Sequence, residues 1–278
     1  MIVVTGATGQ LGFELQRVLL GQSREPAIFL NSTQLNLRNS EQIKSVIVDL
    51  HPTVLINAAA YTQVDKAEGE PEIVRSVNVD APAHMARLAR NLGFRFIHIS
   101  TDYVFDGKAC EPYTENSQIN PQNVYGRTKA DGERAVLETL PSALIIRTSW
   151  VYSRQGHNFV KTVLRLAKER TELRVVFDQV GSLTYAHDLA QTLLKARDLS
   201  GIYHFSNEGA SSWYDVACAV KRLKNLSLEM EPILTRDYPT PAKRPHYSVL
   251  DKSKLKSALN LKIPHWMESL EKCLKEIS

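Results

Sequence analysis

The sequence predicts an α/β fold in which a Rossmann-like, doubly wound parallel sheet carries a smaller C-terminal lobe. Three observations support this prediction. Residues 1–5 form a continuous, largely β-branched run, which is typical of a strand buried on both faces of a parallel sheet. A glycine-rich segment follows at residues 6–12. Strand-type runs then alternate with helix-type segments as far as residue 100, which is the pattern of a doubly wound sheet.

The glycine segment reads Gly6-Ala7-Thr8-Gly9-Gln10-Leu11-Gly12 and leads into a helix with apolar residues at helical spacing. Glycines permit a tight turn and a close backbone approach, and a helix N-terminus attracts a pyrophosphate. A strand before the turn and a helix after it therefore predict a dinucleotide site. The residues that we expect to bind the cofactor from this turn are Gly6, Gly9, Gln10 and Leu11.

The following elements continue the alternation. We expect strands at residues 27–30, 54–57, 96–100 and 143–148, and helices at residues 40–50, 78–92 and from 125 to about 140. Asp65-Lys66-Ala67-Glu68 has the spacing of a capping box and predicts a further helix start.

The end of the second strand indicates the cofactor. An NAD site usually presents a carboxylate to the adenosine ribose here, whereas this chain has Asn31-Ser32-Thr33, with Arg38 further on. Neutral groups and an arginine tolerate a 2′-phosphate, so we expect NADPH to be preferred and NADH to be accepted. Asn36 and Leu37 are candidates for this end of the site. Small residues after the third strand let a flat ligand approach, and the candidates there are Ala58, Ala59 and Tyr61.

A second set of residues predicts catalysis. Tyr125 and Lys129 are four residues apart, so they share one face of a helix, and the ammonium favours the phenolate that forms when Tyr125 gives away its proton. Thr101 follows the strand at residues 96–100, and catalytic groups gather outside the carboxyl ends of such strands. We therefore expect Tyr125 to be a proton donor and Thr101 to hold a carbonyl oxygen.

We assign residues 1–150 to a dinucleotide-binding domain, with segments near 172–206 returning to it. Residues 151–278 are expected to form mainly a substrate-binding lobe, in which several prolines interrupt the helices. Trp150 lies at a strand exit, where it either walls a substrate pocket or belongs to the core. Arg244, in a proline-stiffened loop, either binds a diphosphate or braces the loop.

Composition excludes several classes of function. A net charge of +4, with 43% hydrophobic and 23% charged residues, describes a globular chain and gives no case for nucleic acid or a membrane surface. The cysteines are three in number and far apart, which argues against a disulfide framework or a zinc site and for a reducing compartment. The histidines form no metal-spaced pair, and no metal site is predicted. We expect the protein to be cytoplasmic.

Several motifs together resemble one family. They cover nearly the whole chain in order: residues 6–12, Asn57-Ala58-Ala59-Ala60-Tyr61-Thr62, residues 65–68, Ser100-Thr101-Asp102-Tyr103-Val104-Phe105, Tyr125-Gly126-Arg127-Thr128-Lys129, Arg147-Thr148-Ser149-Trp150-Val151-Tyr152 and Arg244-Pro245. The chain resembles the dTDP-4-dehydrorhamnose reductases of the extended short-chain dehydrogenase/reductase superfamily. The glycine turn and Tyr-x-x-x-Lys are shared across the superfamily, whereas Ser-Thr-Asp-Tyr-Val-Phe and Thr-Ser-Trp-Val-Tyr are narrower.

The resemblance implies an activity and further site residues. The reaction is NAD(P)H-dependent reduction of a sugar 4-keto group to give dTDP-L-rhamnose, with Thr101, Tyr125 and Lys129 as the catalytic set. Hydride is expected at C4, while Tyr125 protonates the alkoxide and Lys129 binds the nicotinamide ribose. The substrate-binding candidates are Thr101, Asp102, Trp150, Asn158 and Arg244. Mg²⁺ is associated with some relatives but is not predicted here, and a homodimer is left open.

One departure and two alternatives stay open. Leu183 stands where the family usually has proline, which puts the local geometry in question. Another nucleotide-sugar epimerase or dehydratase shares the fold, although a 4,6-dehydratase usually has Glu where this chain has Tyr103. A non-catalytic regulatory subunit like that of methionine adenosyltransferase is the other alternative, and retention of Thr101, Tyr125 and Lys129 argues against it.

Overall fold

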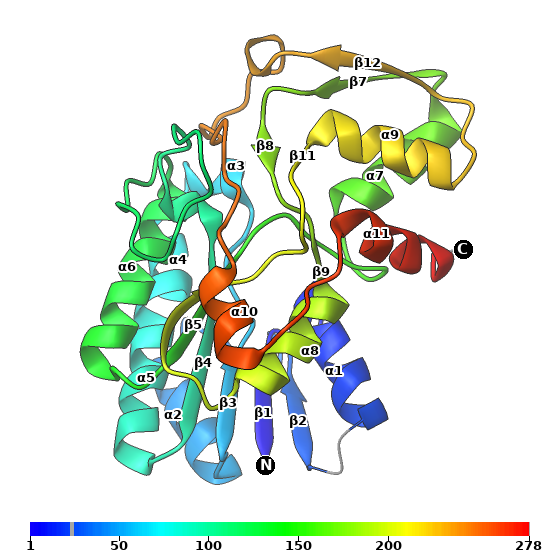
Figure 1. Ribbon diagram of the computed structural model, residues 1–278. Coiled ribbons are helices and arrows are strands. Elements are labelled where there is room, and N and C mark those ends of the chain that lie inside the picture. The colour runs from blue at the N-terminus through cyan, green and yellow to red at the C-terminus, as the bar shows by residue number, and fades with distance from the viewer. Residues whose placement is uncertain (23–24, 278) are drawn as a thin grey trace.

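A six-stranded parallel sheet lies at the centre of the computed structural model, which describes residues 1–22 and 25–277 (Figure 1). The strand order is β10-β5-β4-β3-β1-β2, and every neighbouring pair is parallel. Because β2 lies on one side of β1 and β3 on the other, the chain reverses its winding at β1, which confirms the doubly wound prediction. The strands are β1 (Ile2–Thr5), β2 (Ala27–Leu30), β3 (Val54–Asn57), β4 (Arg95–Thr101), β5 (Leu144–Thr148) and β10 (Gly201–His204).

Helices cover both faces of this sheet, which explains why its central strands are continuously apolar. In β1, Ile2 and Val4 pack into one core cluster, and Val3 packs into the other. The first cluster is covered by α1 (Gln10–Gln22), α8 (Ala186–Ala196) and α10 (Ser253–Leu259). The second is covered by α2 (Ser40–Leu50), α5 (Ala81–Leu92) and α6 (Val124–Thr139).

Short helical segments connect β3 with α5 and β4 with α6. They are α3 (Val64–Ala67), α4 (Pro71–Arg75), the π-helical η1 (Ser76–Asp80) and the 3₁₀-helical η2 (Asp102–Val104). The capping box predicted at Asp65 is not formed. The N-cap of α3 is Gln63, which makes no side-chain cap hydrogen bond, and the Asp65 carboxylate instead accepts hydrogen bonds from Arg244 and from the backbone of Ala242. Asp65 therefore pairs with Arg244, which is distant in the sequence, instead of capping its own helix.

The lobe lies beyond the carboxyl ends of the strands (Figure 1). Its helices α7, α9 and α11 enclose a separate apolar core that includes Val163, Val216 and Leu270. Three small two-stranded sheets join them. The elements are β6 (Val151–Tyr152) with β9 (Thr184–Tyr185), β7 (Glu172–Val176) with β12 (Glu229–Ile233), β8 (Val180–Gly181) with β11 (Ser211–Ser212), α7 (Phe159–Glu169), α9 (Trp213–Leu223), η3 (Thr235–Asp237) and α11 (Trp266–Lys275).

The expected return of residues near 172–206 to the central sheet is wrong for its first part. Residues 186–204 do return, as α8 and β10, whereas β7 pairs with β12 inside the lobe. The burial of β7 supplies the reason, because Glu172 and Arg174 stay exposed, and a strand of the central sheet needs two apolar faces. The domain boundary near residue 150 stays a prediction.

Leu183, the residue that departs from the expected family pattern, belongs to the lobe. Its side chain is 1% exposed and belongs to the lobe core. Its carbonyl oxygen accepts a hydrogen bond from the Asn207 amide at 3.0 Å.

No helix within residues 1–22 and 25–277 has the length and apolarity to cross a membrane.

Candidate active site

A cavity of about 850 Å³ opens at the carboxyl ends of β1, β3 and β4, where the sheet reverses its winding. Ligands of doubly wound proteins bind at this position, and the volume is in the usual range for a cofactor site. The lining runs from the glycine turn to the lobe. Of the predicted site residues it includes Gly6, Gly9, Gln10, Leu11, Asn36, Leu37, Ala58, Ala59, Thr101, Asp102, Tyr125, Lys129 and Trp150.

The glycine turn has the close packing that a pyrophosphate-binding turn requires. Gly6 has φ of +75°, and a Cβ there would lie 2.8 Å from backbone atoms of Ala59. A Cβ on Gly12 would lie 2.2 Å from the Gly6 carbonyl oxygen. Both positions therefore exclude larger residues, and α1 begins within this glycine segment, at Gln10. These residues fit a dinucleotide cofactor.

Gln10 joins this turn to the lobe. Its amide nitrogen donates to the Val151 carbonyl oxygen at 3.1 Å, and its amide oxygen accepts from Asn158 Nδ2 at 2.8 Å. Asn158 also caps α7, because its Oδ1 accepts from the Lys161 amide at 3.0 Å. One side chain of the cofactor turn is therefore held by the first turn of a lobe helix.

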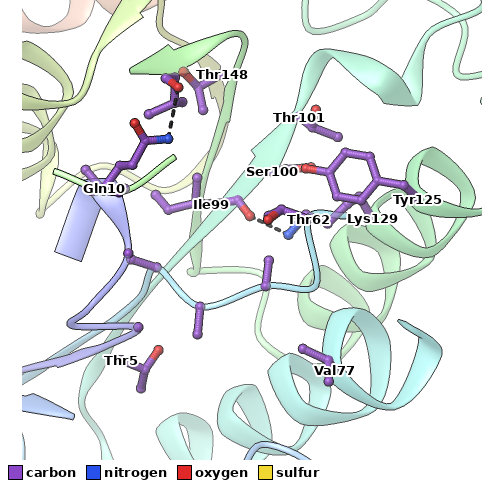
Figure 2. A pocket seen from close by; sticks show the side chains of 18 of the residues that line it. Thr5, Gln10, Thr62, Val77, Ile99, Ser100, Thr101, Tyr125, Lys129 and Thr148 are labelled. Atoms are coloured by element: carbon purple, nitrogen blue, oxygen red, sulfur yellow. Dashed lines mark hydrogen bonds between the residues drawn. The ribbon is translucent and has the colours of Figure 1, made fainter. Parts of the chain in front are cut away.

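The start of α6 positions Tyr125. Asn123 is the N-cap, and its Oδ1 accepts from the Gly126 amide at 2.7 Å. A Cβ on Gly126 would lie 2.2 Å from the Tyr103 carbonyl oxygen, so glycine lets this helix approach η2. In Figure 2 the Tyr125 ring projects from α6 toward the end of β4, which carries Ser100 and Thr101, and Lys129 comes from the same helix.

The surroundings of Tyr125 suit a proton donor. Burial raises the pKa of the phenol to about 12, opposed by a hydrogen bond with Thr101. The phenol therefore keeps its proton at neutral pH. Thr101 Oγ1 donates to Asp102 Oδ1 at 2.9 Å. Burial also raises the pKa of Asp102 to about 6.

Lys129 is 1% exposed and lies one helical turn after Tyr125. Its Nζ donates to the Ile99 carbonyl oxygen at 2.6 Å and lies 3.3 Å from His98 Nε2. Burial lowers the pKa of this amine to about 8, opposed by the negative charge of Glu133. The charge of Lys129 is therefore sensitive to pH close to neutrality.

The end of the cavity next to β2, where we expect the adenosine, is lined by Asn31, Ser32, Asn36, Leu37 and Arg38. The Asn31 side-chain oxygen accepts hydrogen bonds from the amides of the next turn, so it holds the loop in shape. Among the described residues at this end, none that lines the cavity carries a carboxylate. The site thus lacks the group that would repel a 2′-phosphate.

Two tryptophans wall the opposite end. Trp150 has φ of +47° and stacks on Trp213, with ring centroids 3.6 Å apart and planes 9° apart. A Cβ on Gly181 would lie 2.7 Å from the Trp150 ring, so this glycine makes room for the indole. Trp150 therefore lines the cavity and also covers the lobe core.

Three predicted site residues have partners within the protein instead. Tyr61 is outside the cavity lining, and its hydroxyl donates to Glu70 at 2.8 Å. Asn158 lines a separate cavity of about 70 Å³ next to the tryptophans. Arg244 donates to both carboxylate oxygens of Asp65, at 2.7 and 3.0 Å. The assignment of these three residues to ligand binding stays a prediction.

Sequence reasoning missed several residues that line the cavity, among them Thr62, Ser100, Gly156, His157 and Trp213. Trp213 is the first residue of α9, whose capping box joins Ser212 and Asp215. That local signal predicts a helix start, but it contains nothing about Trp150, which is distant in sequence.

No group of three or more His, Cys, Asp or Glu side chains that would suit a metal ion occurs in the described part of the chain.

A Rossmann-like sheet with a glycine turn and a Tyr-x-x-x-Lys pair at one cavity defines the class of short-chain dehydrogenases and reductases. Within that class, the family model described as RmlD substrate binding domain matches residues 1–278, and the chain belongs to this family.

Relatives and solved structures agree with this assignment. The dTDP-4-dehydrorhamnose reductase of Aggregatibacter actinomycetemcomitans is 42% identical, over 97% of this chain and 97% of the relative. A crystal structure of a dTDP-4-dehydrorhamnose reductase from Clostridium acetobutylicum has a TM-score of 0.95 at 39% identity and covers 99% of this chain and 98% of that one. The Bacillus anthracis enzyme, solved in complex with NADP, has a TM-score of 0.95 at 37% identity, with coverage of 99% and 98%.

Proposed function

We propose that this protein reduces the 4-keto group of dTDP-4-dehydro-L-rhamnose to give dTDP-L-rhamnose, with a nicotinamide cofactor as the hydride donor. The observation that carries this proposal is the convergence of Thr101, Tyr125 and Lys129 on the cavity that also contains the glycine turn. The relatives with that activity in their names match almost the full chain, which supports the same substrate class.

The cofactor is held by the sheet side of the cavity. The turn at residues 6–12 and the N-terminus of α1 receive the pyrophosphate, and the small side chains of Ala58 and Ala59 let the cofactor lie against the backbone. We propose NADPH as the preferred cofactor, with NADH accepted. Arg38 and the absence of a carboxylate among the described residues at the adenosine end support this preference.

When bound, the cofactor supplies the hydride. The protein supplies the proton and the polar contacts. Tyr125 gives its proton to the oxygen of the sugar at C4, because burial keeps this phenol protonated at neutral pH. Thr101 turns its single O–H from Asp102 Oδ1 to the same oxygen. The Lys129 ammonium lowers the free energy of the phenolate left behind. A positioned proton donor contributes about a hundredfold to ten-thousandfold in rate.

The lobe side holds the nucleotide sugar. We assign Asp102 and Trp150 to substrate contacts, since both line the cavity that Thr101 also lines. Asn158 contributes by holding the Gln10 side chain in place. Arg244 contributes by joining its loop to Asp65. Tyr103 occupies the place of a dehydratase's extra acid, and burial raises its phenol pKa well above the ordinary value, which disfavours dehydration. We place the reaction in the cytoplasm, with a homodimer left open and Mg²⁺ given no role.

A substrate panel tests the function. Purified protein is mixed with nucleotide 4-keto sugars that differ in base and sugar, and consumption of NADPH and NADH is followed. We expect turnover with dTDP-4-dehydro-L-rhamnose and faster reaction with NADPH. Absence of turnover, together with capture of a methionine adenosyltransferase, would favour the non-catalytic alternative instead.

A further inference from the structure

His98 is a buried titratable residue that has no role in the proposed reaction. It lies in β4, is 1% exposed, and stands between the catalytic lysine and β3. Its Nε2 is 3.3 Å from Lys129 Nζ, and its Nδ1 is 3.1 Å from Asn57 Nδ2. The polar partners at the two ring nitrogens determine which tautomer the ring adopts.

The orientation of the Asn57 amide fixes the proton on the ring. The Ala59 backbone amide, which can only donate, points at Asn57 Oδ1 at 3.3 Å, and Thr5 Oγ1 donates to the same oxygen at 2.6 Å. Asn57 Nδ2 therefore faces His98 Nδ1 and donates to it. A neutral imidazole whose Nδ1 accepts carries its proton on Nε2. The imidazolium is disfavoured, because burial and then the charge of Lys129 lower the pKa of His98 well below its ordinary value.

This tautomer directs a donor at Lys129. An ammonium has three N–H donors and no lone pair, so it has no means of accepting from Nε2–H, whereas a neutral amine accepts through its lone pair. The amine still has N–H groups for the Ile99 carbonyl oxygen at 2.6 Å. The hydrogen bonds around Lys129 thus suit the uncharged amine and oppose the ammonium.

Few other charges act on Lys129. Glu133, one turn along α6, favours the ammonium, but its carboxylate is already bound by Arg147 of β5 at 2.7 and 2.9 Å. His204 of β10 lies 3.4 Å from Arg147 and is kept neutral, since burial lowers its pKa to about 3. From η2 and α6, Asp102 and Tyr125 line the same cavity. Of these groups, His98 is the one that lies within hydrogen-bond distance of Lys129 Nζ, at 3.3 Å.

We propose that His98 is a positioning residue of the reductase, which, held as the Nε2–H tautomer by Asn57, donates to the neutral amine of Lys129 and sets the pH at which that lysine gains its proton. This inference rests on the proposed function in one respect, the role of the Lys129 charge in turnover. The tautomer itself is a property of the protein without substrate.

The tautomer is measured directly by long-range ¹H–¹⁵N correlation spectra of ¹⁵N-histidine-labelled protein, with His98→Gln used to assign the signals. We expect the neutral Nε2–H form of His98 at a pH about one unit above the Lys129 pKa of about 8. An Nδ1–H form at that pH, or an imidazolium at neutral pH, would overturn the inference. Neither result depends on turnover, so failure here is distinct from failure of the proposed function.

The kinetic test uses the pH dependence of kcat at saturating NADPH. Activity is expected to fall as pH rises through the Lys129 pKa, since the ammonium stabilises the phenolate. In His98→Gln the amide oxygen is free to accept a hydrogen bond from the ammonium. The fall in activity on the alkaline side, the alkaline limb of the pH profile, should therefore shift to a pH roughly one unit higher, which is the effect of one hydrogen bond. His84→Gln, on the outer helix α5, should leave the limb in place. An unmoved limb in folded His98→Gln would contradict the proposal.

Discussion

The two sides of the cavity differ in how their polar side chains are used. On the sheet side, Tyr125 and Thr101 project from the first turn of a helix and the end of a strand, and they face the cavity. On the lobe side, Asn158 caps a helix and Arg244 binds Asp65. The sheet side therefore presents chemical groups directly, whereas the lobe side uses similar groups to hold loops in position. Variants on the sheet side should accordingly affect chemistry and cofactor binding, and variants on the lobe side should mainly affect KM.

The largest effect is expected for Tyr125→Phe, which removes the proton donor and keeps the ring. Turnover should fall by about a hundredfold to ten-thousandfold, with the Kd for NADPH nearly unchanged. The measurements are steady-state NADPH oxidation and titration of the cofactor by fluorescence. Tyr203→Phe, in β10 and outside the cavity lining, is the matched control and should keep full activity. A fully active Tyr125→Phe would remove the basis of the proposed chemistry.

Gly6→Ala tests the cofactor turn. The new Cβ would lie 2.8 Å from the Ala59 backbone, in a residue with φ of +75°. Such strain costs about 1–3 kcal/mol. We expect the Kd for NADPH to rise by at least about tenfold, with a lower Tm. In Gly21→Ala the Cβ meets no atom within 4 Å, so that helix variant should bind normally. Equal binding by both variants would show that the turn does not contact the cofactor.

Arg38→Gln tests the adenosine end. If this guanidinium binds the 2′-phosphate, its loss should raise the KM for NADPH by about tenfold, since a hydrogen bond to a charged group contributes about 1.5–3 kcal/mol and this side chain is exposed. The KM for NADH, which lacks that phosphate, should not change. A parallel rise for both cofactors would assign Arg38 to the fold of the loop.

The smallest effect is expected at the pair Arg244 and Asp65, whose side chains are 24% and 40% exposed. Arg244→Gln and Asp65→Asn both break the pair, which should raise the KM for substrate by about twofold to fivefold if the pair only braces the loop. Comparable values in the two variants and in the double variant would support bracing. A much larger rise in Arg244→Gln than in Asp65→Asn would show that Arg244 contacts the substrate, and the sheet and lobe would then differ less than we infer.

The sequence predicted many of the residues that line the sheet side of the cavity, because its signals there are local. The turn at residues 6–12 and the pair Tyr125 and Lys129 each follow from spacing along one element, and the order of elements brings them to the same edge of the sheet. Lobe contacts are set by distant partners. No local pattern shows that Trp150 stacks on Trp213, or that Asp65 prefers Arg244 to its own helix. The strand β7 was misplaced for the same reason, since its partner β12 comes late in the chain.

The most direct test of the account is transfer of deuterium from NADPH labelled at nicotinamide C4 to dTDP-4-dehydro-L-rhamnose, read by mass spectrometry and NMR of the product. The account predicts dTDP-L-rhamnose with one deuterium, at C4 of the sugar, and no such product from Tyr125→Phe on the same timescale. Label at another carbon, or oxidised cofactor with no label in the sugar, would contradict it.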